Sequence, residues 1–174
     1  MSPPVTGPNS ASNLKRLEQK IQTHAETLLV RHLPDLQFAK TKFPNGFDRA
    51  AFKLSHSATT PQDRDPANTL LAAWDAGMND LNEVLRNAYG LKHGLQKIGP
   101  NMPLVYNEPA LALSQAKPLL MVNVSRNLLT HNYPFAAGDA LFDAVETFEK
   151  MLKKTLTEAK TFTLTYAVDI PAVP

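Results

Sequence analysis

The sequence predicts a mainly α-helical protein, a helical bundle of four to five helices followed by a short C-terminal β-strand. Apolar residues recur at spacings of three and four over long stretches, and glycine occurs only 7 times in 174 residues. Sustained alternation of apolar and polar residues appears only near the C-terminus. We therefore expect a flexible N-terminal tail at 1–12, a single helical domain at 13–160, and a strand and tail at 161–174.

The composition is that of an ordinary globular protein, with 43% hydrophobic and 20% charged residues. The absence of cysteine excludes a disulfide scaffold and a thiolate metal site, and it favours a reducing compartment such as the cytoplasm. No apolar run is long enough to span a membrane, so no membrane association is expected. The net charge of +2 permits an anionic partner such as RNA without requiring one. No cofactor is predicted.

The first predicted helix begins after Ser12, which can cap it, and ends near His32 because Pro34 stops it. Its apolar stripe comprises Leu14, Leu17, Ile21 and Leu28. His24 and His32 lie eight residues apart on this helix and could face the same side. No carboxylate pattern accompanies them, so no metal site is predicted there.

Residues 34–66 are predicted to be less regular. Alternation at residues 36–38 is compatible with a short strand. Asp48 can cap a short helix through Leu54, and an exposed loop is expected over residues 55–65.

A long helix is predicted from Asp65-Pro66 to Gly90, because a capping residue before proline favours a helix start and glycine favours a helix end. Its apolar side comprises Leu70, Leu71, Trp74, Met78, Leu81, Leu85 and Ala88. A short helical piece, residues 91–98, is expected to follow it.

Two helices and one strand are predicted in the second half. The first helix starts near Asn107, kinks at Pro118 and continues through the apolar residues 119–129. The second spans roughly Gly138 to Lys160, with a stripe at Leu141, Val145, Phe148, Leu152 and Leu156. The apolar residues Phe162, Leu164, Tyr166, Val168 and Ile170 then alternate with other residues, which indicates a strand. Its pairing partner would be residues 36–43, residues 102–106 or another subunit.

The densest group of reactive side chains lies between Ser125 and Pro134, where the apolar helix is expected to end. It contains Arg126, Asn127, His131 and Tyr133. Arginine offers a planar charged fork suited to phosphate, and histidine can transfer protons near neutral pH. Together they could cleave RNA without a metal, while the amide and the phenol supply hydrogen bonds or stack on a base. Positions five apart lie about 140° apart on an ideal helix. A two-fold dimer would help by bringing two copies of the segment together.

The pattern Arg126-Asn127-x-x-x-His131-x-Tyr133 resembles that of the HEPN superfamily and, more narrowly, of its HepT-type toxin nucleases. The resemblance covers roughly residues 107–160, whereas Pro118 and the final strand depart from the family pattern. It implies a helical bundle, dimerisation through the helices that carry the motif, and metal-independent RNA cleavage. For the HepT type it also implies a nucleotidyltransferase antitoxin that modifies Tyr133.

The leading prediction is a homodimeric HEPN-like endoribonuclease, the toxin of a toxin–antitoxin or defence system. In it Arg126 binds the scissile phosphate, His131 transfers protons, and Asn127 and Tyr133 support them. The alternative is a non-enzymatic helical interaction protein, such as an adaptor, immunity or structural component. In that alternative the strand at 161–170 adds to the sheet edge of a partner.

Overall fold

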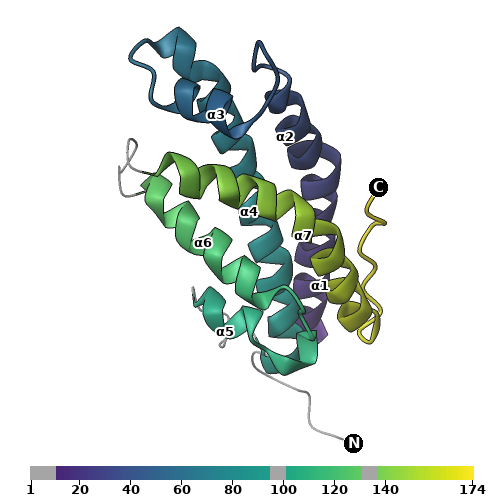
Figure 1. Cartoon of the computed structure of the whole chain (residues 1–174). Helices are drawn as coiled ribbons and strands as arrows, with labels where there is room; N and C mark the ends of the chain where they lie inside the picture. Colours follow the sequence, from purple (N-terminus) through teal and green to yellow (C-terminus); the bar gives the residue numbers. More distant parts are fainter. Residues whose placement is uncertain (1–10, 95–100, 131–136) are drawn as a thin grey trace, which may run out of the picture.

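The computed structural model describes residues 11–94, 101–130 and 137–174, and the regular elements in these ranges are all helical. In chain order they are α1 (Ala11–Thr27), the π-helix η1 (Leu28–His32), α2 (Leu33–Lys40), α3 (Arg49–His56), α4 (Pro61–His93), α5 (Met102–Tyr106), the 3-10 helix η3 (Pro109–Leu111), α6 (Ala116–Thr130) and α7 (Gly138–Leu164). Figure 1 shows α4 in the middle of a bundle, with α1 and α2 along one side and α6 and α7 along another. The predicted mainly helical fold is confirmed. Within the predicted N-terminal tail, residues 1–10 lie outside the described residues, while Ala11 and Ser12 already belong to α1.

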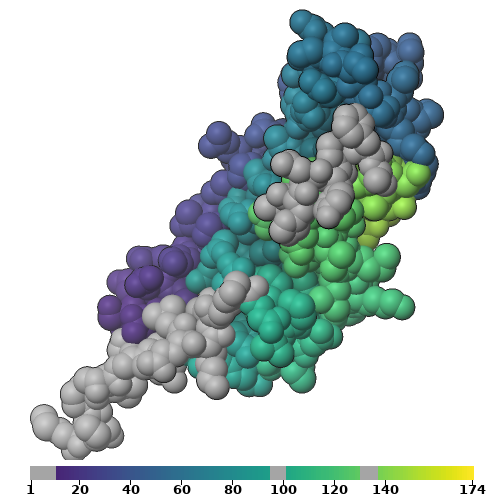
Figure 2. Space-filling model, turned by 90° about the vertical axis from the view of Figure 1, so that its left-hand side faces the viewer, coloured from purple at the N-terminus to yellow at the C-terminus, as the bar shows by residue number. Residues whose placement is uncertain are grey.

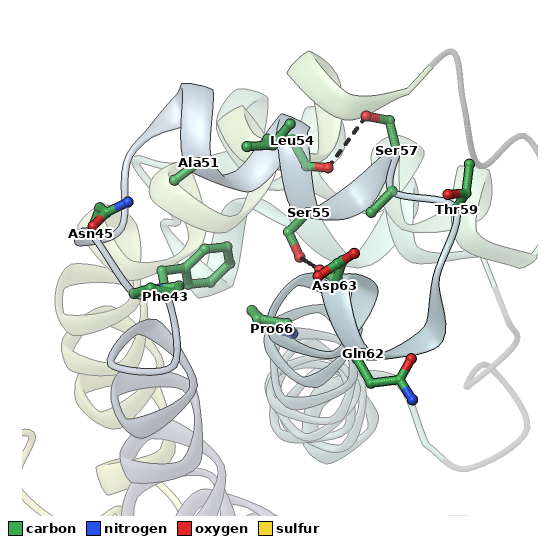
Figure 3. A pocket seen from close by; sticks show the side chains of 12 residues that line it. Phe43, Asn45, Ala51, Leu54, Ser55, Ser57, Thr59, Gln62, Asp63 and Pro66 are labelled. Atoms are coloured by element: carbon green, nitrogen blue, oxygen red, sulfur yellow. Dashed lines mark hydrogen bonds between the residues drawn. The ribbon is translucent and has the colours of Figure 1, made fainter.

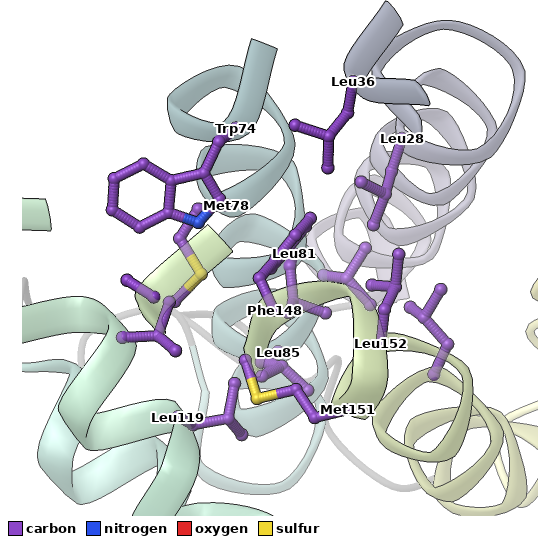
Figure 4. Close-up of a cluster of buried hydrophobic side chains, with 14 of the residues drawn as sticks. Leu28, Leu36, Trp74, Met78, Leu81, Leu85, Leu119, Phe148, Met151 and Leu152 are labelled. Carbon is purple, nitrogen blue, oxygen red and sulfur yellow. The ribbon is translucent and has the colours of Figure 1, made fainter. Parts of the chain in front are cut away.

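The hydrophobic core is built around α4. All seven residues of its predicted apolar side are buried, and so are the five of the predicted α7 stripe. Figure 4 shows Trp74 and Leu81 of α4 packed among Leu28 and Leu36 from the N-terminal helices and Phe148 from α7. Burial of these stripes supplies the main free energy that holds the helices together.

The first helix does not end at Pro34, and residues 36–38 do not form a strand. The helical path continues to Lys40 through the π-helix η1, in which the Leu33 amide donates to the Leu28 carbonyl oxygen. Proline cannot donate an amide hydrogen bond, and its ring crowds the carbonyl four residues earlier in a regular α-helix. A turn with i to i+5 bonding is wider and accommodates this proline without a break.

The boundaries of α4 and α6 also differ from the prediction. α4 starts at Pro61, where the Thr60 hydroxyl caps it by accepting from the Asp63 amide at 3.2 Å, and it passes Gly90 to end before Gly94 (φ 83°). α6 starts at Ala116, so Pro118 lies in its first turn instead of producing a kink. Proline is tolerated in a first turn because the amides there have no partner within the helix.

The predicted C-terminal strand is wrong: α7 continues to Leu164, and residues 165–174 contain no strand. Ala167 adopts φ 59°, its amide donates to the Leu164 carbonyl, and the Val168 amide donates to the Thr163 carbonyl. These two bonds are those of a Schellman motif, which reverses the chain at the end of a helix. Val168 and Ile170 are then buried, and the Lys160 ammonium donates to the Ile170 carbonyl at 2.6 Å. The tail therefore folds back onto its own helix.

Glu108 fastens the segment between α5 and α6 to the end of α4. Its carboxylate is 9% exposed and accepts from the Ala110 amide, from Lys92 at 3.0 Å and from His93 at 2.7 Å. Burial alone would raise the pKa of Glu108, but these hydrogen bonds and the nearby charge outweigh it and lower the pKa to about 2.

Candidate functional site

The structure describes one part of the predicted Arg-Asn-x-x-x-His-x-Tyr site. Arg126 and Asn127 lie on the penultimate turn of α6, while His131 and Tyr133 lie outside the described residues. α6 is held in place by the side that Leu119 and Val122 bury in the core. Asn127 is exposed, whereas Arg126 is half-buried.

Arg126 is tied to α4 by Asp75. Its Nε donates to Asp75 Oδ1 at 2.5 Å, and the two side chains are 24% and 46% exposed. A guanidinium has five N–H donors in one plane. The bond at Nε therefore fixes the orientation of that plane. The two terminal nitrogens make no hydrogen bond to a described residue and remain able to bind a ligand. This arrangement suits the binding of an anion on the terminal edge.

A buried hydrogen-bond chain lies beside Arg126, and the sequence did not reveal it. The Tyr106 hydroxyl donates to Asn82 Oδ1 at 2.5 Å, and Asn82 Nδ2 donates to Asn123 Oδ1 at 3.2 Å. Tyr106 and Asn82 are only 1% and 3% exposed. Burial raises the pKa of Tyr106, while the bond to Asn82 and the charges of Arg126 and Arg86 lower it by less. The phenol therefore stays protonated and acts as a donor.

Arg86 lies on the same side of α4, one turn after Asn82. Its side chain is 22% exposed; Nη1 is paired with Glu83 and Nη2 contacts the Met102 sulfur at 3.4 Å. Its Nε is buried and has no acceptor among the described residues. In the sequence, Asp75, Asn82 and Arg86 recur at spacings of seven and four, which is a signal that could have placed polar groups along this side of α4.

A second polar cluster joins α1 to the opposite side of α4. Asp80, 6% exposed, lies between two imidazoles: His24 Nδ1 is 2.7 Å from Oδ1, and His32 Nε2 is 3.0 Å from Oδ2. The second contact is close, but Oδ2 makes no hydrogen bond of regular geometry. The two histidines thus do face one side, and their carboxylate comes from a helix 56 residues away from His24. In the described ranges no group of three or more His, Cys, Asp or Glu side chains is arranged to hold a metal ion.

Two larger hollows that described residues line do not have Arg126 on their walls. The pocket in Figure 3 has a volume of about 600 Å³ and is lined mainly by α3, the preceding turn and the start of α4. The Ser55 hydroxyl in this pocket already donates to the Asp63 carbonyl and accepts from the Ala67 amide, so this hydroxyl is not free to bind a ligand. A groove of about 560 Å³ runs between α6 and α7, with Met121 on its wall.

A scan against protein-family models and searches of curated proteins and of solved structures each found no match to this chain. No helix in the described part of the chain is both long enough and apolar enough to cross a membrane.

Proposed function

We propose that the protein is a HEPN-like endoribonuclease that cleaves RNA without a metal, using Arg126 and His131. The proposal includes its role as a cytoplasmic toxin of a toxin–antitoxin or defence system. The observation that supports it is the burial and fixed orientation of the Arg126 guanidinium near the end of α6. The guanidinium is half-buried, oriented by Asp75 at 2.5 Å, and five residues before the histidine.

The proposed reaction is a transesterification within the RNA chain. A base removes the proton of the 2′-hydroxyl, whose oxygen attacks the neighbouring phosphorus. The bond to the 5′-oxygen breaks, and an acid protonates this leaving oxygen, so the products are a 2′,3′-cyclic phosphate and a 5′-hydroxyl. The terminal nitrogens of Arg126 hold the phosphate as negative charge develops, and His131 transfers the protons. Asn127 and Tyr133 contribute hydrogen bonds or stack on a base.

A homodimer would supply a second histidine, so that one acts as base and the other as acid. The surface of α6 supports this part of the proposal, because Met121 and Val124 are 64% and 62% exposed and Leu128 continues their stripe one turn later. Figure 2 shows α6 (green) at the surface of the molecule beside α4 (teal). A two-fold axis along this stripe would bring two copies of α6 together, with Arg126 on the side of each helix that faces Asp75 of α4.

The alternative function as an interaction protein required a C-terminal strand for partner binding. That strand is not formed, and its residues Val168 and Ile170 are buried within the chain.

The direct test is cleavage of single-stranded RNA in EDTA by the wild type and by Arg126→Ala and His131→Ala. Both substitutions are expected to reduce the rate by at least about 100-fold, as loss of a main catalytic group does. Arg49→Ala is the control, because Arg49 is an exposed arginine paired with Asp139 and Asp143 on α7. Equal activity in all four proteins would exclude the proposed site.

The dimer is tested separately by sedimentation. Met121→Glu is expected to produce monomers, whereas Phe38→Glu, at a similarly exposed apolar residue of α2 (65%), is not. A wild type that is monomeric at the concentrations of the cleavage assay would exclude the two-histidine form of the mechanism.

A further inference from the structure

Arg86 has hydrogen-bonding capacity that the described residues do not use. Glu83 takes only Nη1, and the acceptor near Nη2 is the thioether of Met102 at 3.4 Å, which is a weak acceptor. Nε is buried without an acceptor among the described residues. A buried donor without a good acceptor is costly, so its retention in a folded protein needs an explanation, and a bound anion is one. Nε and Nη2 form one side of the guanidinium fork, the side that binds two oxygens of one phosphate.

Arg86 and Arg126 lie on either side of one buried polar chain. Asn82 is four residues before Arg86 on α4, and Asn123 is three residues before Arg126 on α6. The bond between these two amides joins the helices, and Tyr106 donates to the same Asn82 side chain. Both guanidinium charges act on the Tyr106 hydroxyl, so both are near it. A chain of three neutral side chains, Tyr106, Asn82 and Asn123, thus connects the helices that carry the two arginines.

We infer that Arg86 is a second phosphate-binding residue, which holds another phosphate of the RNA chain whose scissile phosphate is bound by Arg126. This inference rests on the proposed ribonuclease function. This second phosphate binds the Nε and Nη2 side of Arg86 and displaces the Met102 sulfur, while Nη1 stays paired with Glu83. Met102 is 3% exposed, so the phosphate reaches Nε only after this unbranched, flexible side chain rotates away. Single-stranded RNA carries a phosphate at each nucleotide, so a substrate longer than a dinucleotide offers such a group.

The test measures binding of a single-stranded RNA oligonucleotide to His131→Ala protein, which removes the proposed proton-transfer group. In that background Arg86→Ala and Arg86→Lys are each expected to weaken binding about tenfold, since lysine keeps the charge but loses the fork. The slope of log affinity against log salt should decrease by about 0.7 for Arg86→Ala, as expected for one phosphate contact on a single strand. In otherwise wild-type protein, the same substitutions should raise KM more than they lower kcat. Arg49→Ala is the matched control and should leave affinity and salt slope unchanged.

The possible results distinguish failure of the Arg86 inference from failure of the proposed function. If Arg86→Ala or, should that variant not fold, Arg86→Lys binds RNA with unchanged affinity and salt slope while Arg126→Ala abolishes cleavage, Arg86 is not a phosphate ligand and the proposed function stands. A fall in kcat with unchanged KM would likewise overturn the inference, because a binding residue acts on affinity. If the wild type neither binds nor cleaves RNA, the proposed function itself fails.

Discussion

The substitution Ile170→Ala tests directly whether the C-terminal tail folds back onto α7. Ile170 is 0% exposed, whereas Leu164, six residues earlier, is 54% exposed. Truncation of a fully buried isoleucine to alanine costs about 2–5 kcal/mol, since apolar burial is lost and a cavity remains. For a protein of this length each kcal/mol lowers Tm by about 2–4 °C, so the expected decrease is about 4–20 °C.

Leu164→Ala is the matched control, because it removes a similar side chain from an exposed position and should change Tm by less than about 2 °C. Thermal unfolding followed by circular dichroism, with urea unfolding as a second measure, gives both values. The comparison is informative because residues 164 and 170 would share one face of a β-strand. Equal effects of the two substitutions would refute the folded-back tail and support a strand.

Three further predictions concern the fold around α4. Gly77→Ala should destabilise the protein by about 1 kcal/mol in urea unfolding, because the added Cβ would lie 3.2 Å from Phe148 Cζ and overpacking outweighs the gain in helix propensity; an increase in stability would mean that this ring moves freely. Glu108 has a folded pKa of about 2 against an ordinary value of 4.5, so its contribution is complete above about pH 4.5 and is lost as the pH falls towards 2. Glu108→Gln should therefore lower the free energy of unfolding by about 1–2 kcal/mol at pH 6, a value reduced for solvent screening, and by almost nothing at pH 2. An effect on urea unfolding that is the same at both pH values would contradict this reasoning. Tyr106→Phe should cost about 1–3 kcal/mol because it leaves Asn82 Oδ1 buried without its donor, and an unchanged urea midpoint would show that this bond contributes nothing.

The long amphipathic helices could be predicted from the sequence because their apolar stripes extend over many turns. Every residue of the predicted α4 and α7 stripes is buried. The tail was misread because the apolar residues at 162, 164, 166, 168 and 170 fit alternation, while residues four apart also share one side of a helix. The Phe162 and Tyr166 rings do contact each other at that helical spacing, with centroids 5.3 Å apart and planes tilted by 51°. The chain turns away from α7 at Ala167, which adopts a left-handed conformation. Alanine seldom adopts this conformation, so the sequence pattern did not predict the turn.

The candidate site was predictable only in part. The sequence placed Arg126 near the end of an apolar helix, which the structure confirms, but its partner Asp75 lies 51 residues earlier. A contact across that distance depends on how α6 packs in the bundle and leaves no local pattern. The bond between Asn82 of α4 and Asn123 of α6 likewise depends on how the two helices pack, so no local sequence pattern predicts it.

The second polar cluster shows how one proline can determine a contact several turns away. His24 and His32 are eight residues apart, which in a regular α-helix would place them about 80° apart around the axis. The π-helix η1 begins after His24 and ends at His32, and it contains more residues per turn, so it removes most of that difference and directs both imidazoles to Asp80. The same wide turn is what accommodates Pro34. Proline, π-turn and histidine pair therefore form one feature of the α1–α4 interface, and a regular helix through residues 28–32 would separate His32 from the carboxylate that it now contacts.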